Sequence, residues 1–113
     1  MIIGIGCDIV KIDKIQQVLK YGNFIDFFTK KEQLLCSSMN DKRKIEWLAG
    51  RFAAKEAIFK SINNHHNCTL RDIEVLSDDK GMPYCKITGI SICISISHED
   101  EYAIAYAIAY SSS

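Results

Sequence analysis

The sequence predicts an α+β fold in which an antiparallel sheet packs on helices. A strand pattern at the N-terminus is followed by a helical middle, and alternating strand patterns fill the C-terminal part. This order favours α+β over a parallel α/β sheet, in which strands and helices would alternate. The 113 residues, 48% of them hydrophobic, suit one small domain over residues 1–113 whose limited core would gain stability from self-association.

The N-terminal strand, expected over residues 2–10, places an acid beside two glycines. Side chains alternate between the two faces of a strand, so Gly4, Gly6 and Asp8 share one face. Because glycines leave room for a close approach, we expect something bulky to come near the Asp8 carboxylate. The Gly4-x-Gly6 pair does not predict a dinucleotide site, because the third glycine is missing and the pair lies inside the strand.

Three helical segments are expected in the middle of the chain. The first has Asp13 as a suitable N-cap and ends near Gly22. The second lies within residues 24–38, and its core candidates are Phe27, Phe28, Leu34 and Leu35. The longest runs from about residue 41 to residue 63, where apolar side chains recur at helical spacing. Gly50 interrupts this helix and indicates either a close approach or a tolerated glycine.

The C-terminal part predicts a hairpin followed by two long strands. The hairpin strands and their turn are expected at residues 73–77, 84–88 and 78–81. From residue 90 to residue 97 isoleucine alternates with serine or cysteine, and from residue 102 to residue 110 tyrosine or isoleucine alternates with alanine. Both patterns have the period of a strand, and residues 98–101 form the turn between them.

The long helix carries a charged cluster with two interpretations. Arg51 and Lys55 are four residues apart, as are Glu56 and Lys60. They form either a solvated helix face, with ion pairs worth about 0.2–0.5 kcal/mol each, or cations that clamp a pyrophosphate while Glu56 holds a metal ion. Magnesium takes one or two carboxylates together with phosphate oxygens and water, so Asp8 and Glu56 are candidate ligands of one ion.

Three other features leave simple alternatives open. Lys11 and Lys14 either solubilise the first helix or dock an acidic partner. His98, next to Ser97, is either a surface histidine or a donor to a phosphate. The set formed by His65, His66 and Cys68 lacks a fourth metal ligand, and a polar loop is the better interpretation.

Composition excludes several classes of function. A net charge of zero argues against a nucleic-acid partner, and no apolar run is long enough to predict a membrane span. The cysteines number five, without a CxxC pair, which is typical of free thiols in a reducing cytoplasm. We therefore expect a cytoplasmic protein.

Four segments together resemble a known family. Gly4 to Val10 (Gly-Ile-Gly-Cys-Asp-Ile-Val) resembles the first motif of the holo-acyl-carrier-protein synthases, in the 4′-phosphopantetheinyl transferase superfamily. Arg51 to Lys60 resembles the second and most specific motif. Gly81 to Tyr84 resembles the family's Gly-x-Pro turn, and Ser95 to His98 followed by Tyr102 to Ala105 resembles its closing strands. The segments occur in the family's order and span nearly the whole chain.

The resemblance implies transfer of 4′-phosphopantetheine from coenzyme A to a serine of an apo-acyl carrier protein, with release of adenosine 3′,5′-bisphosphate, in fatty acid biosynthesis. It also implies magnesium, a 4′-phosphopantetheinyl transferase-like fold and a homotrimer with active sites between subunits. One departure is that the family usually has a helix before the closing strands, where this chain has only Gly89 and its neighbours. A non-catalytic module that binds coenzyme A or an acidic partner is the alternative from another class.

The resemblance also implies a role for individual residues. Asp8 and Glu56 would be metal ligands, and with Lys60 they would be the catalytic residues. Lys11 and Lys14 would dock the carrier. The coenzyme A contacts would be Arg51, Lys55, Lys60, Gly81, Pro83, Ser97 and His98.

Overall fold

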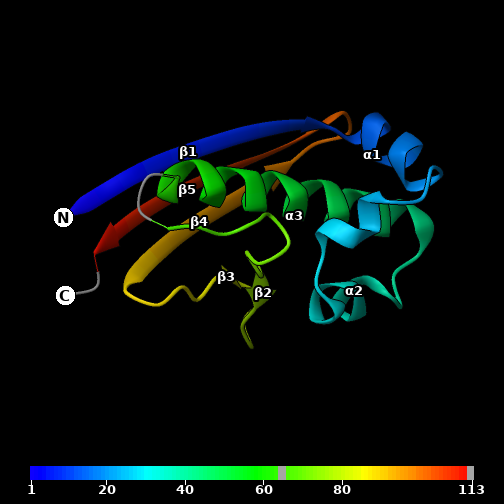
Figure 1. The fold of residues 1–113 in the computed structure, drawn as a ribbon. Helices are drawn as coiled ribbons and strands as arrows, with labels where there is room; N and C mark the ends of the chain where they lie inside the picture. Colours follow the sequence, from blue (N-terminus) through cyan, green and yellow to red (C-terminus); the bar gives the residue numbers. More distant parts are fainter. Residues whose placement is uncertain (64–65, 112–113) are drawn as a thin grey trace.

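The structure, a computed structural model, describes residues 1–63 and 66–111 and has the predicted α+β architecture. In chain order its elements are β1 (Ile2–Lys11), α1 (Ile12–Leu19), the 3-10 helix η1 (Phe24–Phe27), α2 (Lys30–Cys36), α3 (Asp41–Ile62), β2 (Leu76–Ser77), β3 (Pro83–Tyr84), β4 (Ile90–His98) and β5 (Tyr102–Ser111). Figure 1 shows α3 lying along one face of the long strands, with α1 and α2 toward one end of the molecule. The strands beneath α3 therefore form a platform that a single helix covers.

The main sheet has three antiparallel strands in the order β1-β5-β4. β5 is central, and its register pairs Ala105 with Asp8 of β1 on one side and with Ile96 of β4 on the other. Both predicted C-terminal strands are confirmed, as is the turn between them, where the Glu99 amide donates to the Tyr102 carbonyl at 2.9 Å. The register thus places Asp8 level with the part of β4 that precedes His98.

α3 lies very close to β1 because small residues face each other there. A Cβ atom added to Gly4 would lie 1.9 Å from the Ser61 carbonyl oxygen, and one added to Gly6 would lie 2.0 Å from the Ala57 carbonyl oxygen. The inward side chains of β5 are also small and buried: Ala103, Ala105, Ala107 and Ala109. The backbone of α3 therefore fills the space at the two glycines, through which a bulky group was expected to approach the Asp8 carboxylate.

A buried ion pair joins α3 to α2. The Lys55 Nζ donates to the Glu32 Oε1 at 2.7 Å, and neither side chain is exposed. Glu32 also accepts from the amides of Thr29 and Val75, both at 2.8 Å. Burial lowers the pKa of Lys55, and the hydrogen bond and charge of Glu32 oppose that change. A buried pair is tolerated when further hydrogen bonds satisfy its atoms, so this pair fixes three segments together.

The second predicted helix is divided in two, and three of its four core candidates are not buried. Thr29 has extended backbone angles because it caps α2, where its hydroxyl accepts from the Glu32 amide at 3.2 Å. α2 consequently turns Glu32 and Cys36 inward. Phe28 is fully buried as predicted, whereas the core predictions for Phe27, Leu34 and Leu35 are wrong because these side chains are exposed.

Two further boundaries differ from the predictions. Asp13 is not the N-cap of α1, because β1 leads directly into the helix and the Ile12 amide donates to the Glu101 carbonyl at 2.9 Å. The expected hairpin keeps its turn, but each of its strands, β2 and β3, has two residues. The strand before the turn is short because the Val75 amide bonds to Glu32 instead of to a neighbouring strand.

The end of α3, the turn at Gly89 and the state of the cysteines agree closely with the sequence expectations. α3 ends at Ile62, one residue before the predicted end. The short connection around Gly89 is confirmed as a turn, in which Gly89 has a φ of 79° and the Ile90 amide donates to the Ile87 carbonyl. All five cysteines are free thiols. In residues 1–63 and 66–111 no helix has the length and apolar character needed to cross a membrane. His65 lies outside the described residues.

Substitution of Gly6 tests the contact between α3 and β1. The Gly6→Ala variant should unfold with a free energy lower by about 3 kcal/mol, because its Cβ cannot coexist with the Ala57 carbonyl and the helix must move. Cys7→Ala is the matched control, since Cys7 is the next residue and its side chain is exposed. Denaturant unfolding at one protein concentration measures both. Equal losses in the two variants would contradict the close packing.

Candidate active site

Asp8 and Glu56 line the same open cavity, of about 630 Å³, between β1, α1 and α3. Both side chains are half-buried. Burial raises the pKa of Glu56 above its ordinary value, the negative charge of Asp8 raises this pKa further, and Lys60 opposes both. The fold thus brings two acids that are far apart in the sequence into electrostatic contact.

Lys60 lies beside the two acids and remains accessible. Its Nζ donates to the Cys7 carbonyl oxygen at 3.0 Å and lies 3.4 Å from the Asp8 Oδ1. The Lys60 side chain is 54% exposed, whereas that of Asp8 is 19% exposed. A long, exposed ion pair of this kind stabilises a fold only slightly, so the ammonium group is available to a negatively charged ligand.

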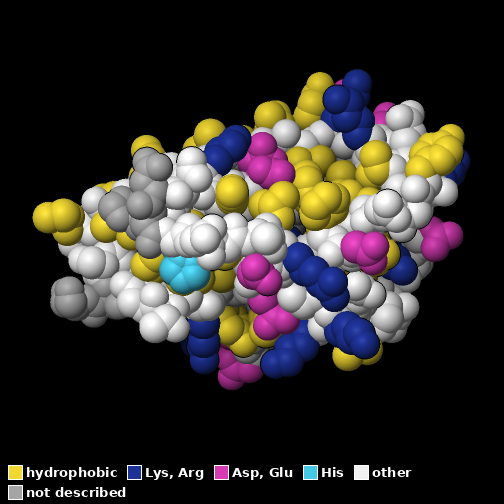
Figure 2. Space-filling model, in the orientation of Figure 1, with side chains coloured by type: hydrophobic (Ala, Val, Ile, Leu, Met, Phe, Trp, Pro, Cys, Tyr) yellow, Lys and Arg dark blue, Asp and Glu magenta, His cyan; other side chains and the backbone are white. Residues whose placement is uncertain are grey.

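The rest of this cavity is apolar and has a basic rim. Lys11 and Lys14 line it and are exposed. Its apolar walls include Ile9, Ile15, Val18, Phe24 and Phe52. Figure 2 shows hydrophobic side chains gathered on this face between α3 and α1, next to acidic and basic side chains. The cavity therefore combines a charged end with an apolar channel.

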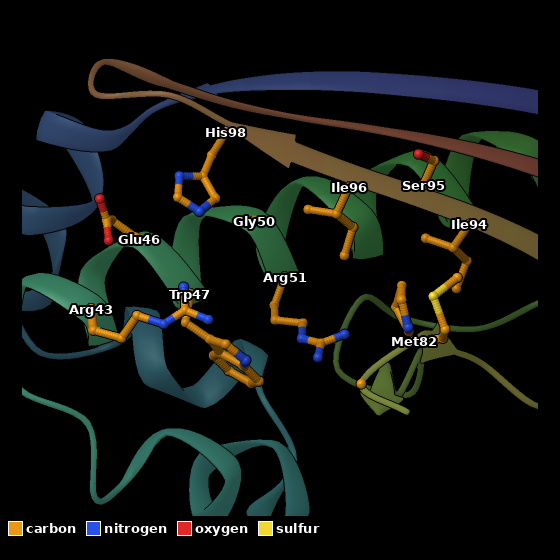
Figure 3. Close-up of a pocket in the computed structure, with 12 residues that line it drawn as sticks. Arg43, Glu46, Trp47, Gly50, Arg51, Met82, Ile94, Ser95, Ile96 and His98 are labelled. Atoms are coloured by element: carbon orange, nitrogen blue, oxygen red, sulfur yellow. The ribbon is translucent and has the colours of Figure 1, made fainter. Parts of the chain in front are cut away.

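A second cavity, of about 360 Å³, lies between α3, β4 and the turn that links β2 to β3. Four predicted coenzyme A contacts line it: Arg51, Gly81, Pro83 and His98. Figure 3 shows His98 extending from β4 toward side chains of α3. Ser97, also predicted as a contact, is not among the lining residues and is exposed.

Arg51 is the most constrained cation of the second cavity. It is only 6% exposed, and its guanidinium carbon lies 4.8 Å from the centre of the Trp47 ring. One Nη donates to the Ser77 hydroxyl, while the Nη1 has no hydrogen-bond partner in the described part of the chain. Burial lowers the pKa of Arg51, and the charge of Glu32 opposes this. The Nη1 is itself buried, so Arg51 offers the cavity its positive charge and not an exposed free donor.

Lys55 does not belong to either cavity. The prediction that it contacts coenzyme A is wrong for this structure, because its side chain is fully buried and bonded to Glu32. Its neighbours Arg51 and Glu56 reach different cavities. The charged cluster of α3 is thus neither one solvated face nor one phosphate clamp, since its members point in three directions.

The remaining predicted residues fall into two groups on different sides of α3. Asp8, Glu56 and Lys60 are together on the β1 side, whereas Arg51 and His98 are together on the β4 side. Successive helical residues are about 100° apart around the axis, which explains how one helix contributes to both cavities. The two groups do not share a cavity within one chain.

Sequence reasoning missed several residues of the second cavity. They precede Arg51 on the same side of α3, and they are Arg43, Glu46 and Trp47. Gly50, interpreted from the sequence as a close approach or a tolerated glycine, also lines this cavity. The available signal was the spacing of three or four residues that places such positions on one helix face.

Comparison with known proteins places the chain in a family. Residues 4–107 match the family model of the 4′-phosphopantetheinyl transferase superfamily. A holo-[acyl-carrier-protein] synthase of Geobacillus is 45% identical over 96% of this chain and 96% of that protein. The corresponding protein of Halalkalibacterium halodurans is 40% identical over 96% and 95%.

Solved structures agree with this match. A crystal structure of a holo-(acyl-carrier-protein) synthase from Bacillus anthracis, in complex with CoA (3′,5′-ADP), covers 99% of each chain with a TM-score of 0.89 and 36% identity. The holo-[acyl-carrier-protein] synthase of Helicobacter pylori, in complex with coenzyme A, has a TM-score of 0.80, with 28% identity over 94% of this chain. The chain therefore belongs to the 4′-phosphopantetheinyl transferase superfamily, as an enzyme of its holo-[acyl-carrier-protein] synthase family.

Proposed function

We propose that this protein transfers 4′-phosphopantetheine from coenzyme A to a serine of an apo-acyl carrier protein, in a magnesium-dependent reaction that serves fatty acid biosynthesis. The observation that carries the proposal is the convergence of Asp8 and Glu56 on one cavity beside the exposed Lys60. The names of the relatives, including those solved with coenzyme A, agree with it. This chemistry needs a group that binds a metal ion, a cation for phosphates and a base, and these residues supply all three.

The pair formed by Asp8 and Glu56 fits a magnesium ion. Two half-buried carboxylates that repel each other are stabilised by a cation between them, and Asp8 already raises the pKa of Glu56. Magnesium is commonly held by one or two carboxylates, with water and substrate phosphates as its other ligands. A bound magnesium ion would neutralise the negative charge that develops on the pyrophosphate.

The cations of the site would bind the phosphates of coenzyme A. Lys60 has an accessible ammonium group next to Asp8, suited to the diphosphate. The positive charge of the Arg51 guanidinium, which lines the second cavity, would attract a phosphate there. Such donors stabilise the transition state of phosphoryl transfer because they are already in position when charge develops.

In this mechanism the carrier serine attacks the β-phosphorus of coenzyme A, which carries the pantetheine arm. The bond from the serine oxygen to this phosphorus forms, and the bond to the bridging oxygen of the diphosphate breaks, releasing adenosine 3′,5′-bisphosphate. Glu56 accepts the serine proton through a water molecule. Its carboxylate suits it to this role, because an ionised carboxylate positioned beside a water molecule can act as a general base.

The carrier would approach along the basic rim of the first cavity. Lys11 and Lys14 are exposed and line this cavity on the side of α1. Electrostatic complementarity increases the association rate of oppositely charged surfaces. An acidic carrier docked on these lysines would present its serine to Glu56, at the charged end of the same cavity.

The complete site would form in a homotrimer. α3 covers one face of the main sheet (Figure 1), and apolar side chains are exposed on strand positions that face away from it: Ile5, Ile9, Tyr106 and Ile108. Exposed apolar patches of this kind indicate protein interfaces. His98 and Glu56 line different cavities of one chain. Contact between copies would bring the His98 cavity of one subunit next to the Glu56 cavity of another, and active sites would then lie between subunits.

The Glu56→Gln variant tests the chemical step. Turnover should fall at least about 100-fold, because the amide neither accepts the serine proton nor binds magnesium as a carboxylate does. Mass spectrometry of an apo-carrier incubated with coenzyme A and magnesium measures transfer as the mass of one phosphopantetheine group.

Two controls accompany this assay. Glu99→Gln, which changes an exposed glutamate outside both cavities, should retain activity. Quenching of the fluorescence of Trp47, the only tryptophan of the chain, reports nucleotide binding separately. Normal transfer by the Glu56→Gln variant would refute the proposed role of Glu56. Binding of coenzyme A by the unmodified protein without transfer would indicate a non-catalytic module.

Substitutions on the apolar sheet face test the assembly. The unmodified protein should sediment as three copies of the 12.8 kDa chain. Ile5→Glu should dissociate it, because each copy would bury a charge without a partner. Leu34→Glu is the matched control, since Leu34 and Ile5 are both 71% exposed but Leu34 lies on α2. A trimer that survives Ile5→Glu but not Leu34→Glu would place the interface elsewhere, and a monomeric unmodified protein would refute the trimer.

A further inference from the structure

The orientation of Arg51 depends on a single hydrogen bond. One of its Nη atoms donates to the hydroxyl of Ser77, and in the part of the chain that the structure describes the side chain makes no other hydrogen bond and no ion pair. The Trp47 ring, which lies beside the guanidinium (Figure 3), attracts its charge but aligns none of its N–H groups. Ser77 is therefore the residue that orients the guanidinium.

The surroundings of Arg51 make this hydrogen bond important. Burial lowers the pKa of Arg51, the charge of Glu32 opposes this change, and the charge of Arg43 lowers the pKa further. A buried charge is costly unless hydrogen bonds replace the water that it has lost. Without the Ser77 hydroxyl, the guanidinium would therefore lose its fixed orientation.

Ser77 itself is held by the chain on both sides. The amide of Val75, two residues earlier, donates to the buried Glu32 carboxylate at 2.8 Å. Directly after Ser77, the Asp78 Oδ1 accepts from the Met82 amide at 2.8 Å, and the Asp78 amide donates to the Met82 carbonyl at 2.9 Å. Because both anchors lie within the protein, the Ser77 hydroxyl is in place before any ligand binds.

Ser77 lies behind the wall of the second cavity. It is half-buried and is not among the lining residues, whereas Arg51 and Pro83, which pairs with Ser77 across the hairpin, both line the cavity. A ligand in the cavity would thus meet Arg51 and not Ser77. A residue in such a place affects binding only through the group that it holds.

We propose that Ser77 is a positioning residue, whose hydroxyl holds the Arg51 guanidinium in the orientation in which its charge attracts a phosphate of coenzyme A. This inference rests on the proposed function, because it takes coenzyme A to be the ligand. A group that is oriented in advance spares the ligand the cost of ordering it. Ser77 therefore favours the binding of coenzyme A and leaves the chemical step at Asp8 and Glu56 unchanged.

The Ser77→Ala variant tests the proposal by the steady-state kinetics of transfer to an apo-carrier. Its KM for coenzyme A should rise at least about fivefold, because a hydrogen bond from a charged group is lost. Its kcat should change less than about twofold. Ser77→Thr keeps a hydroxyl and should have the normal KM. A merely structural role would lower the fraction of active protein, and with it kcat, without changing KM.

A second substitution shows whether Ser77 acts through Arg51. Calorimetry measures the affinity for coenzyme A without requiring turnover. In an Arg51→Met background, Ser77→Ala should weaken binding less than about twofold, because the effects of residues in contact do not add. Ser37→Ala is the matched control, since it removes an exposed hydroxyl that is bonded to the Leu34 carbonyl, and it should bind coenzyme A normally.

Three results would overturn the role of Ser77. They are a normal KM in Ser77→Ala, a KM in Ser77→Thr as high as in Ser77→Ala, and an equal loss of affinity on Ser77→Ala with and without Arg51. Affinity for coenzyme A that depends on Ser77, in a protein that transfers nothing to a carrier, would refute the proposed function alone.

Discussion

The contact between the α3 backbone and the glycines of β1 is the constraint on which the rest of the site depends. Carbonyl oxygens of α3 occupy the space in which side chains at Gly4 and Gly6 would otherwise lie. Asp8 follows Gly6 on the same strand face, and Glu56 precedes Ala57, whose carbonyl makes the contact. The acids meet because helix and strand are packed at backbone distance. A larger residue at either glycine would separate them before it changed any group that performs chemistry.

The charged side chains of α3 point in different directions around the helix. Arg51 is directed to the cavity beside β4, Lys55 to the interior, and Glu56 to the cavity beside β1. The buried pair of Lys55 and Glu32 fixes the rotation of the helix, because each group would be an unpaired buried charge without the other. The same rotation sends Arg51 and Glu56 to opposite cavities. A structural ion pair thus supports a site that it does not enter.

The long, regular elements could be predicted from the sequence because their patterns are local. The alternation in β4 and β5 and the apolar period of α3 depend only on neighbouring residues, as does the shared face of Gly6 and Asp8. The burial of Lys55 could not be predicted in this way, since it depends on Glu32, which precedes it by 23 residues in the chain. The division between two cavities was missed for a similar reason: the cluster was considered as one surface, whereas each position on a helix faces a different neighbour.

The central claim is that Asp8 and Glu56 act as one site for a divalent cation. Mn²⁺, which has ligand preferences like those of Mg²⁺, can be titrated by electron paramagnetic resonance into the unmodified protein, Asp8→Asn, Glu56→Gln and the double variant. Each single substitution should weaken binding at least about tenfold, and the double variant should be little weaker than either single one, because ligands of one ion are not independent. Losses that add in the double variant, or unchanged affinity in either single variant, would contradict the account.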